Sequence, residues 1–203
     1  MKFIQKLIFS SIFFLFPIFL IAQSTESSNI DDDKIHVSVT GKETTFKEVR
    51  VETIIHAPID SVVAFVTNID NYKNWMFKCQ DSKMLKSYQA DDYIYYVEID
   101  MPYPTTNRDV VIRSNYIWTV DKKSFHITSK AENDFLAKDD DFVRVEELET
   151  EWKIEEISPG KTRVIHLNKI NPGGNLPLWM INLAAETGPM KTVKKLKKIL
   201  DAR

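Results

Sequence analysis

The sequence predicts an α+β domain in which one curved antiparallel sheet packs around a long C-terminal helix. Segments of alternating apolar and polar residues follow one another from residue 35 to residue 170, and this period is typical of half-buried strands. Convincing helical periods occur at only two places, after Pro58 and after Pro177. Because strands and helices do not alternate along the chain, a doubly wound nucleotide-binding fold is disfavoured.

The N-terminus has the residue order of a secretory signal peptide. Lys2 and Lys6 stand beside an apolar run from Leu7 to Ala22, and a polar stretch follows. The run is shorter than the ~20 apolar residues that span a bilayer, and it ends in small residues. We therefore predict that residues 1–22 are a cleaved signal peptide rather than a retained anchor, and that the protein is exported to a periplasm or secreted.

The remaining chain is predicted to form one domain with a mildly acidic surface. Residues 23–34 are rich in Ser, Asn and Asp and are predicted to be a disordered linker, and residues 35–203 form the domain. Removing residues 1–22 takes two of the 27 basic residues and none of the 29 acidic ones, so the formal net charge changes from −2 to −4. Nucleic acid is not expected as a partner, because phosphate binding relies on clustered Lys and Arg. The single cysteine, Cys79, excludes an intramolecular disulfide.

The domain is predicted to begin with a hairpin and a helix. Apolar residues alternate with polar ones over residues 35–39 and 49–55, with a turn at Gly41. Pro58 then stands at a first helical position, and apolar residues recur at helical spacing to about Asn68.

A meander of strands follows a short aromatic turn. Strand-like segments are predicted at residues 83–88, 92–101, 108–120, 124–131, 143–157 and 162–170. One face of these segments is apolar and aromatic; Val110, Ile112, Ser114 and Tyr116 share it, while Arg113 points the other way. Periodicity alone does not distinguish a packed core from a cavity on that face.

Pro177 starts a helix that is predicted to reach almost to Arg203. Its apolar residues can share one stripe, and its lysines fall on the other side. Gly188 and Pro189 interrupt this helix, so a kink is expected there. Since the apolar sheet face must be buried, this helix is expected to cover it.

Motifs for catalysis, phosphate binding or metal binding are absent from the sequence, so no cofactor and no metal are expected. The four histidines lie far apart in the sequence. His126 and His166 are candidates for acid–base chemistry only if their strands turn them inward. Alternation places His126 on the wrong face and leaves His166 undecided.

Two motifs point to a family. Pro102-Tyr103-Pro104 is followed by Asn107-Arg108-Asp109-Val110-Val111, and Asn171-Pro172-Gly173-Gly174-Asn175-Leu176-Pro177 precedes the last helix. With these motifs the chain, from about Asn29 to Leu200, resembles the START (steroidogenic acute regulatory protein-related lipid transfer) domain of the helix-grip superfamily, in a bacterial exported form.

The resemblance implies a helix-grip fold with an internal cavity and a non-enzymatic protein that binds or transfers one lipid, sterol-like or other apolar molecule. Sterol-binding members carry a basic residue on the inward face where this chain has Ser114, which puts sterol specificity in doubt. Cyclase-like members of the superfamily supply the alternative, a cyclase or dehydratase-like enzyme acting on an apolar substrate in the same cavity. A scaffold with a collapsed cavity is a third hypothesis. Arg108 is expected to brace its strand through an acidic neighbour.

The residues expected to line the cavity are Tyr95, Val97, Ile99, Val110, Ile112, Ser114, Tyr116, Phe125, Ile127, Trp179, Leu183 and Met190. Of these, Ser114, Tyr95 and Tyr116 are expected to hydrogen-bond the ligand. The expected partners are a hydrophobic small molecule or lipid and, transiently, a membrane surface. The alternative for the lysine-rich helix face is simple solvation.

Overall fold

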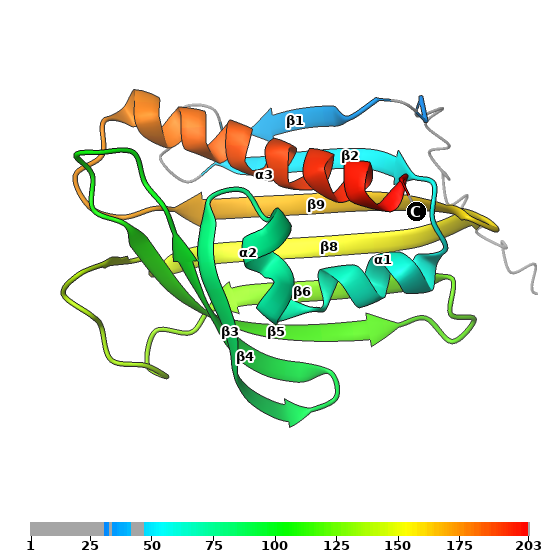
Figure 1. Ribbon diagram of the computed structural model, residues 1–203, viewed down its shortest axis with the longest axis horizontal. Coiled ribbons are helices and arrows are strands. Elements are labelled where there is room, and N and C mark those ends of the chain that lie inside the picture. Colours follow the sequence, from blue (N-terminus) through cyan, green and yellow to red (C-terminus); the bar gives the residue numbers. More distant parts are fainter. Residues whose placement is uncertain (1–30, 33, 42–46, 203) are drawn as a thin grey trace, which may run out of the picture.

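The fold is a mainly antiparallel sheet curved around one long helix (Figure 1). The computed structural model describes residues 31–202 except 33 and 42–46, and leaves aside the side chains of residues 178 and 182–184. The predicted signal peptide and most of the predicted linker lie outside the described residues. The α+β fold class is confirmed.

Nine strands are present in the described part of the chain. They are β1 (His36–Thr40), β2 (Glu48–Ile55), β3 (Cys79–Gln89), β4 (Asp92–Ile99), β5 (Arg108–Trp118), β6 (Ser124–Ala131), β7 (Val143–Arg144), β8 (Glu147–Ser158) and β9 (Lys161–Asn171). The helices over the same residues are α1 (Ile59–Val66), a 3-10 turn (Ile69–Asn71), α2 (Tyr72–Trp75) and α3 (Leu178–Leu200).

The strand order is β1-β2-β9-β8-β6-β5-β4-β3. The predicted hairpin and meander are both present, and β2 joins them by pairing antiparallel with β9. The segment predicted as one strand, residues 143–157, forms two strands instead. The first, β7, pairs parallel with β5, and the second, β8, begins at Glu147. Val143 N and Val145 N donate to carbonyls of residues 107 and 109, which holds this segment against the start of β5.

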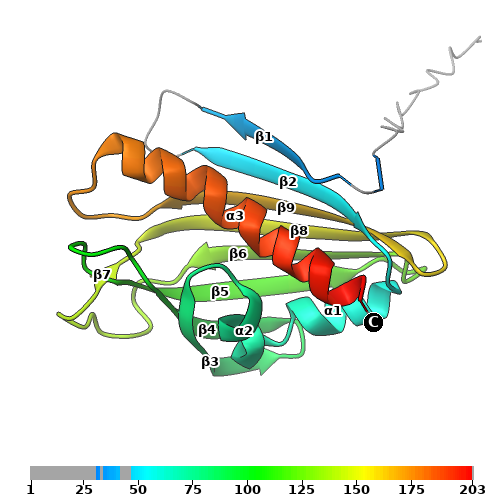
Figure 2. The same ribbon diagram turned by 45° about the horizontal axis from the view of Figure 1, so that its top comes forward.

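The helices cover the concave face of the sheet (Figure 2). α3 contacts β2 and β9, α1 contacts β8 and β9, and α2 contacts β3 and α3. Helix α3 continues through Pro189 as one element, and none of the helices in the described part of the chain has the length and hydropathy to cross a membrane.

The C-terminal half of α3 is packed tightly into the core. Val193, Leu196 and Leu200 are buried and join a cluster that includes Val49 and Val51 of β2. Their spacing puts them on one side of the helix, as the sequence predicts. This half of α3 therefore closes its end of the domain.

Polar contacts fix the last turn of α3. Lys197 Nζ donates to Ile54 O at 2.6 Å, and His56 N donates to Asp201 Oδ1 at 2.8 Å. Asp32, in the predicted linker, forms an ion pair with Lys161, and its carbonyl accepts from Lys197 Nζ at 3.2 Å. The end of that predicted linker is therefore attached to the domain.

A buried ion pair holds the outer face of the sheet. Arg144 Nε and Nη2 donate to the two carboxylate oxygens of Asp109, both at 2.9 Å, and each side chain is only 2% exposed. Arg144 also donates to Leu136 O and Ala137 O, which attaches the loop before β7 to β5. The two parallel hydrogen bonds match the planar guanidinium to the carboxylate.

Breaking this pair should be costly. Arg144→Met leaves the Asp109 carboxylate buried and uncompensated, so we expect a loss of about 3–5 kcal/mol in the free energy of unfolding. The measurement is urea denaturation. Arg113→Met is the matched control: it breaks a pair with Asp92 whose side chains are 44% and 19% exposed, and it should cost less than about 1 kcal/mol. Equal losses in the two variants would contradict the role assigned to Arg144.

Candidate functional site

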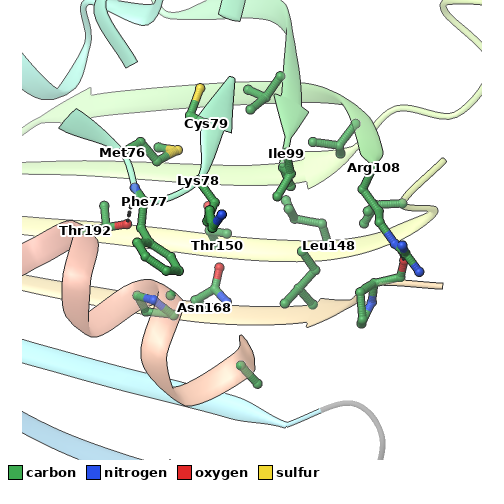
Figure 3. Close-up of a pocket in the computed structure, with 18 of the residues that line it drawn as sticks. Met76, Phe77, Lys78, Cys79, Ile99, Arg108, Leu148, Thr150, Asn168 and Thr192 are labelled. Atoms are coloured by element: carbon green, nitrogen blue, oxygen red, sulfur yellow. Dashed lines mark hydrogen bonds between the residues drawn. The ribbon is translucent and has the colours of Figure 1, made fainter. Parts of the chain in front are cut away.

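A cavity of about 420 Å³ lies between the N-terminal half of α3 and the sheet (Figure 3). Its walls come from β4, β5, β8, β9, the segment from α2 into β3, and α3. Residues that line it are Val97, Ile99, Val110, Ile112, Leu148, Trp152, Ile170, Met180, Ile181 and Ala185. Alternation brings the strand residues together, because every second residue of each strand points to the concave face, and Met180, Ile181 and Ala185 belong to α3.

Charged side chains at the exposed side of the cavity have partners. Lys78 forms an ion pair with Asp100, and Lys191 Nζ lies 4.6 Å from the ring centroid of Phe77. Phe77 N donates to Thr192 Oγ1 at 3.1 Å, which joins the segment after α2 to α3 (Figure 3). These contacts connect the two sides of the cavity.

Arg108 holds the loop that leads into α3. Its guanidinium donates to Pro172 O at 3.2 Å, to Gly173 O at 3.1 Å and to Thr106 O. The prediction that Arg108 braces its strand through an acidic side chain is wrong, because carbonyl oxygens of two loops are its partners and the neighbouring Asp109 pairs with Arg144 instead. Arg108 also lines the cavity (Figure 3).

His166 faces the cavity from β9, which decides the question that its sequence pattern left open. Its ring stacks on Trp152 with the centroids 3.9 Å apart. Desolvation by burial lowers the pKa of His166 to about 4, although a hydrogen bond to Glu151 O opposes the shift. The imidazole is therefore neutral at pH 7. His126 instead lies 3.3 Å from Glu151 Oε2 and does not line the cavity.

Five of the predicted lining residues do line the cavity: Tyr95, Val97, Ile99, Val110 and Ile112. Phe125 and Ile127 share the same face but are buried in the core cluster, and Ser114 Oγ lies 2.6 Å from Ser129 Oγ there. Tyr116 donates to Ala90 O. Alternation gives the face of a residue but not its position along the sheet, and α1 lies across the half of the sheet where these residues pack (Figure 1).

The three predicted lining residues on α3 have different positions. Trp179 is 64% exposed, Met190 does not line the cavity, and the side chain of Leu183 lies outside the described residues. Whether any of the predicted residues binds a ligand stays a prediction.

Several lining residues were not predicted. Leu148, Trp152, His166, Asn168 and Ile170 come from the last two strands. Their alternation was visible in the sequence, and it would have placed them on the same face as Val164. Met76 and Cys79 beside α2 had no such signal, because they follow an irregular turn.

A metal site finds no support in the described residues, where no three His, Cys, Asp or Glu side chains gather. The Cys79 thiol lines the cavity, and burial raises its pKa to about 11. It is therefore protonated at neutral pH and is a poor nucleophile or metal ligand.

Comparison with known proteins gives the class of the fold and site. The START domain family matches residues 25–203. An uncharacterized protein of Pseudomonas aeruginosa is 32% identical over 177 residues, which cover 85% of each chain. Mouse phosphatidylcholine transfer protein is 29% identical over 136 residues, which cover 64% of this chain and 62% of the mouse protein.

Solved structures agree with these matches. A STAR-related lipid transfer protein fragment from Xanthomonas axonopodis superimposes with a TM-score of 0.75 at 25% identity, over 84% of this chain and 96% of the fragment. Human StAR-related lipid transfer protein 5 has a TM-score of 0.73 at 15% identity over 85% of each chain, which shows the shared fold. The chain belongs to the START domain family.

The buried His166 predicts a pH dependence of stability. Because its pKa is about 4 in the folded protein and about 6.5 in an unfolded chain, the unfolded state takes up a proton first as the pH falls. The free energy of unfolding should therefore decrease between pH 6.5 and pH 4, by about 3 kcal/mol from this residue. Urea denaturation at several pH values should show that His166→Gln lacks this part of the decrease. Parallel curves for the two proteins would contradict the prediction.

Proposed function

We propose that this protein binds one hydrophobic molecule in the cavity under α3 and carries it between membranes without changing it chemically. The observation that carries the proposal is the mostly apolar cavity of about 420 Å³. This volume is within the range of roughly 300–1,000 Å³ for sites that enclose a small molecule. The names of two relatives, a phosphatidylcholine transfer protein and a STAR-related lipid transfer protein, support a lipid as the ligand class.

The acid–base groups in the cavity favour a carrier over a cyclase or dehydratase-like enzyme. General acid–base catalysis is most effective when the pKa of the group is near the working pH. The pKa of His166 is about 4 and that of Cys79 about 11, so neither group exchanges protons readily at neutral pH. The guanidinium of Arg108 is engaged with backbone carbonyls.

Export and membrane contact complete the proposed function. The order of charged, apolar and polar residues over residues 1–24 supports export through a signal peptide. Tyr103 is 98% exposed and Trp179 is 64% exposed, and each is next in sequence to a residue that lines the cavity, Pro102 or Met180. Aromatic side chains with a polar end suit a membrane–water interface.

Filling the cavity should abolish ligand binding. Ile112→Phe adds volume to the cavity wall from β5, so detergent-free protein analysed by native mass spectrometry should lose the apolar adduct that the unmodified protein carries. Ile117→Phe on the same strand is the control, because Ile117 is 69% exposed and does not line the cavity. Solvent extraction of the adduct would give its lipid class. A protein that carries no adduct and binds nothing from a lipid panel would contradict the proposal.

Membrane contact should depend on the exposed aromatic residues. Tyr103→Ser with Trp179→Ser should reduce cosedimentation with vesicles several-fold, because two interfacial anchors are lost. Ile117→Ser removes a comparably exposed apolar side chain elsewhere and should leave binding unchanged. Lys191, Lys194, Lys195 and Lys198 are exposed on α3, so the vesicles should be compared with and without anionic lipid. Binding that is unchanged in the double variant would exclude this surface as the contact.

A further inference from the structure

A row of polar side chains crosses the inner face of the sheet. Residues that pair across neighbouring strands form it, in the order Tyr93 (β4), Ser114 (β5), Ser129 (β6), Thr150 (β8) and Asn168 (β9). The neighbouring pairs on the same face are mostly apolar: Ile127 with Trp152 on one side of the row, and Leu148 with Ile170 on the other. A polar row in an apolar surface is costly unless its groups are hydrogen-bonded.

The two halves of this row differ in how their hydrogen-bonding groups are used. In the packed half, the Ser114 and Ser129 hydroxyls lie 2.6 Å apart. Burial raises the pKa of the neighbouring Tyr95, and these two hydroxyls oppose that shift. In the other half, Thr150 and Asn168 line the cavity, where Figure 3 shows their side chains close together on neighbouring strands. Neither side chain has a hydrogen-bond partner among the described residues.

His166 adds a third free group beside them. It is on the same strand as Asn168, two residues away, and it is 7% exposed. Its Nδ1 lies 3.2 Å from Glu151 O, and because a carbonyl oxygen only accepts, Nδ1 carries the ring proton of the neutral imidazole. Nε2 is therefore an acceptor, and it has no partner in the part of the chain that the structure describes.

We infer that Thr150, Asn168 and His166 form a subsite for a neutral hydrogen-bond donor of the ligand, such as an alcohol hydroxyl. The inference rests on the proposed function and specifies its ligand class as a neutral amphiphile with an O–H or N–H group. A hydroxyl there donates to His166 Nε2 and accepts from the Asn168 carboxamide, while its apolar body occupies the rest of the cavity. The Thr150 hydroxyl adapts to either role, since it both donates and accepts.

An anionic group does not fit this subsite. A carboxylate would face the lone pair of His166 Nε2, and it would lose water without gaining a cation. The cations that line the cavity are already engaged: Arg108 with backbone carbonyls, Lys78 with Asp100, and Lys191 over the ring of Phe77.

Three probes with one hydrocarbon chain test the subsite. The full chain is incubated with oleyl alcohol, its methyl ether and sodium oleate, separately and as an equimolar mixture, and occupancy is measured by native mass spectrometry. The alcohol should bind about tenfold more tightly than the ether, in which a methyl group replaces the hydroxyl hydrogen, because the ether leaves buried acceptors unpaired. Oleate should bind more weakly than the alcohol.

Variants with side chains of similar shape then remove the polar groups of the subsite with little change in the volume of the cavity. Thr150→Val with Asn168→Leu, and separately His166→Phe, should reduce the preference for alcohol over ether to less than about threefold while the ether still binds. Thr128→Val is the matched control, because Thr128 is exposed on β6, and it should keep the full preference. Retained ether binding shows that a variant is folded with its cavity intact.

The outcomes separate the two proposals. Equal binding of all three probes, tighter binding of oleate, or an alcohol preference that survives in both variants would overturn the subsite while leaving the carrier function standing. If none of the probes binds and the purified protein carries no adduct, both the subsite and the carrier function are wrong.

Discussion

The dipeptide Arg108-Asp109 at the start of β5 is the constraint on which the cavity depends. Adjacent residues of a strand point to opposite faces, so the two side chains fasten different loops from one backbone position. Arg108 donates to Pro172 O and Gly173 O at the entrance to α3, and Asp109 binds Arg144 on the outer face. The backbone at residue 174 favours glycine because φ is +67°, and a Cβ there would lie only 3.2 Å from Arg108 Nη2. This contact is the physical link between the two sequence motifs that identify the family.

The two halves of α3, which follows the loop held by Arg108, have different roles. Its C-terminal half is buried against β2 and is tied to the preceding chain by Lys197 and Asp201. Its N-terminal half covers a void, and a void lowers stability because the atoms that line it lose packing contacts. This domain has no disulfide to offset the stability lost to the cavity, so the dense packing around the C-terminal half of α3 offsets it. The arrangement keeps a binding volume open while the helix stays attached.

The electrostatics of the cavity are consistent with a neutral ligand. Charges at its exposed side are paired or stacked, as Lys78 and Lys191 show, and the interior contains a histidine whose pKa is too low for it to be charged at pH 7. The polar row across the sheet passes from hydroxyls that hydrogen-bond one another in the core to cavity groups that have no hydrogen-bond partner among the residues the structure describes. One register of strand pairing therefore produces both a closed core and a polar position within an apolar space.

The sequence by itself determined the order of the elements except β7, the inward faces of β4 and β5 and the burial of α3 through its apolar stripe, because these depend on local periodicity. It predicted Ser114 inside and Arg113 outside, and both positions are confirmed. Tertiary structure alone decided where along the strands the core ends and the cavity begins, since that depends on where α1 and α3 lie over the sheet. For this reason Val110 and Ile112 line the cavity while Phe125 and Ile127, which have the same periodicity, are packed in the core. The sequence also could not predict the partners of Arg108 in the loop before α3. They are backbone carbonyls about 65 residues away, and backbone groups have no sequence signature.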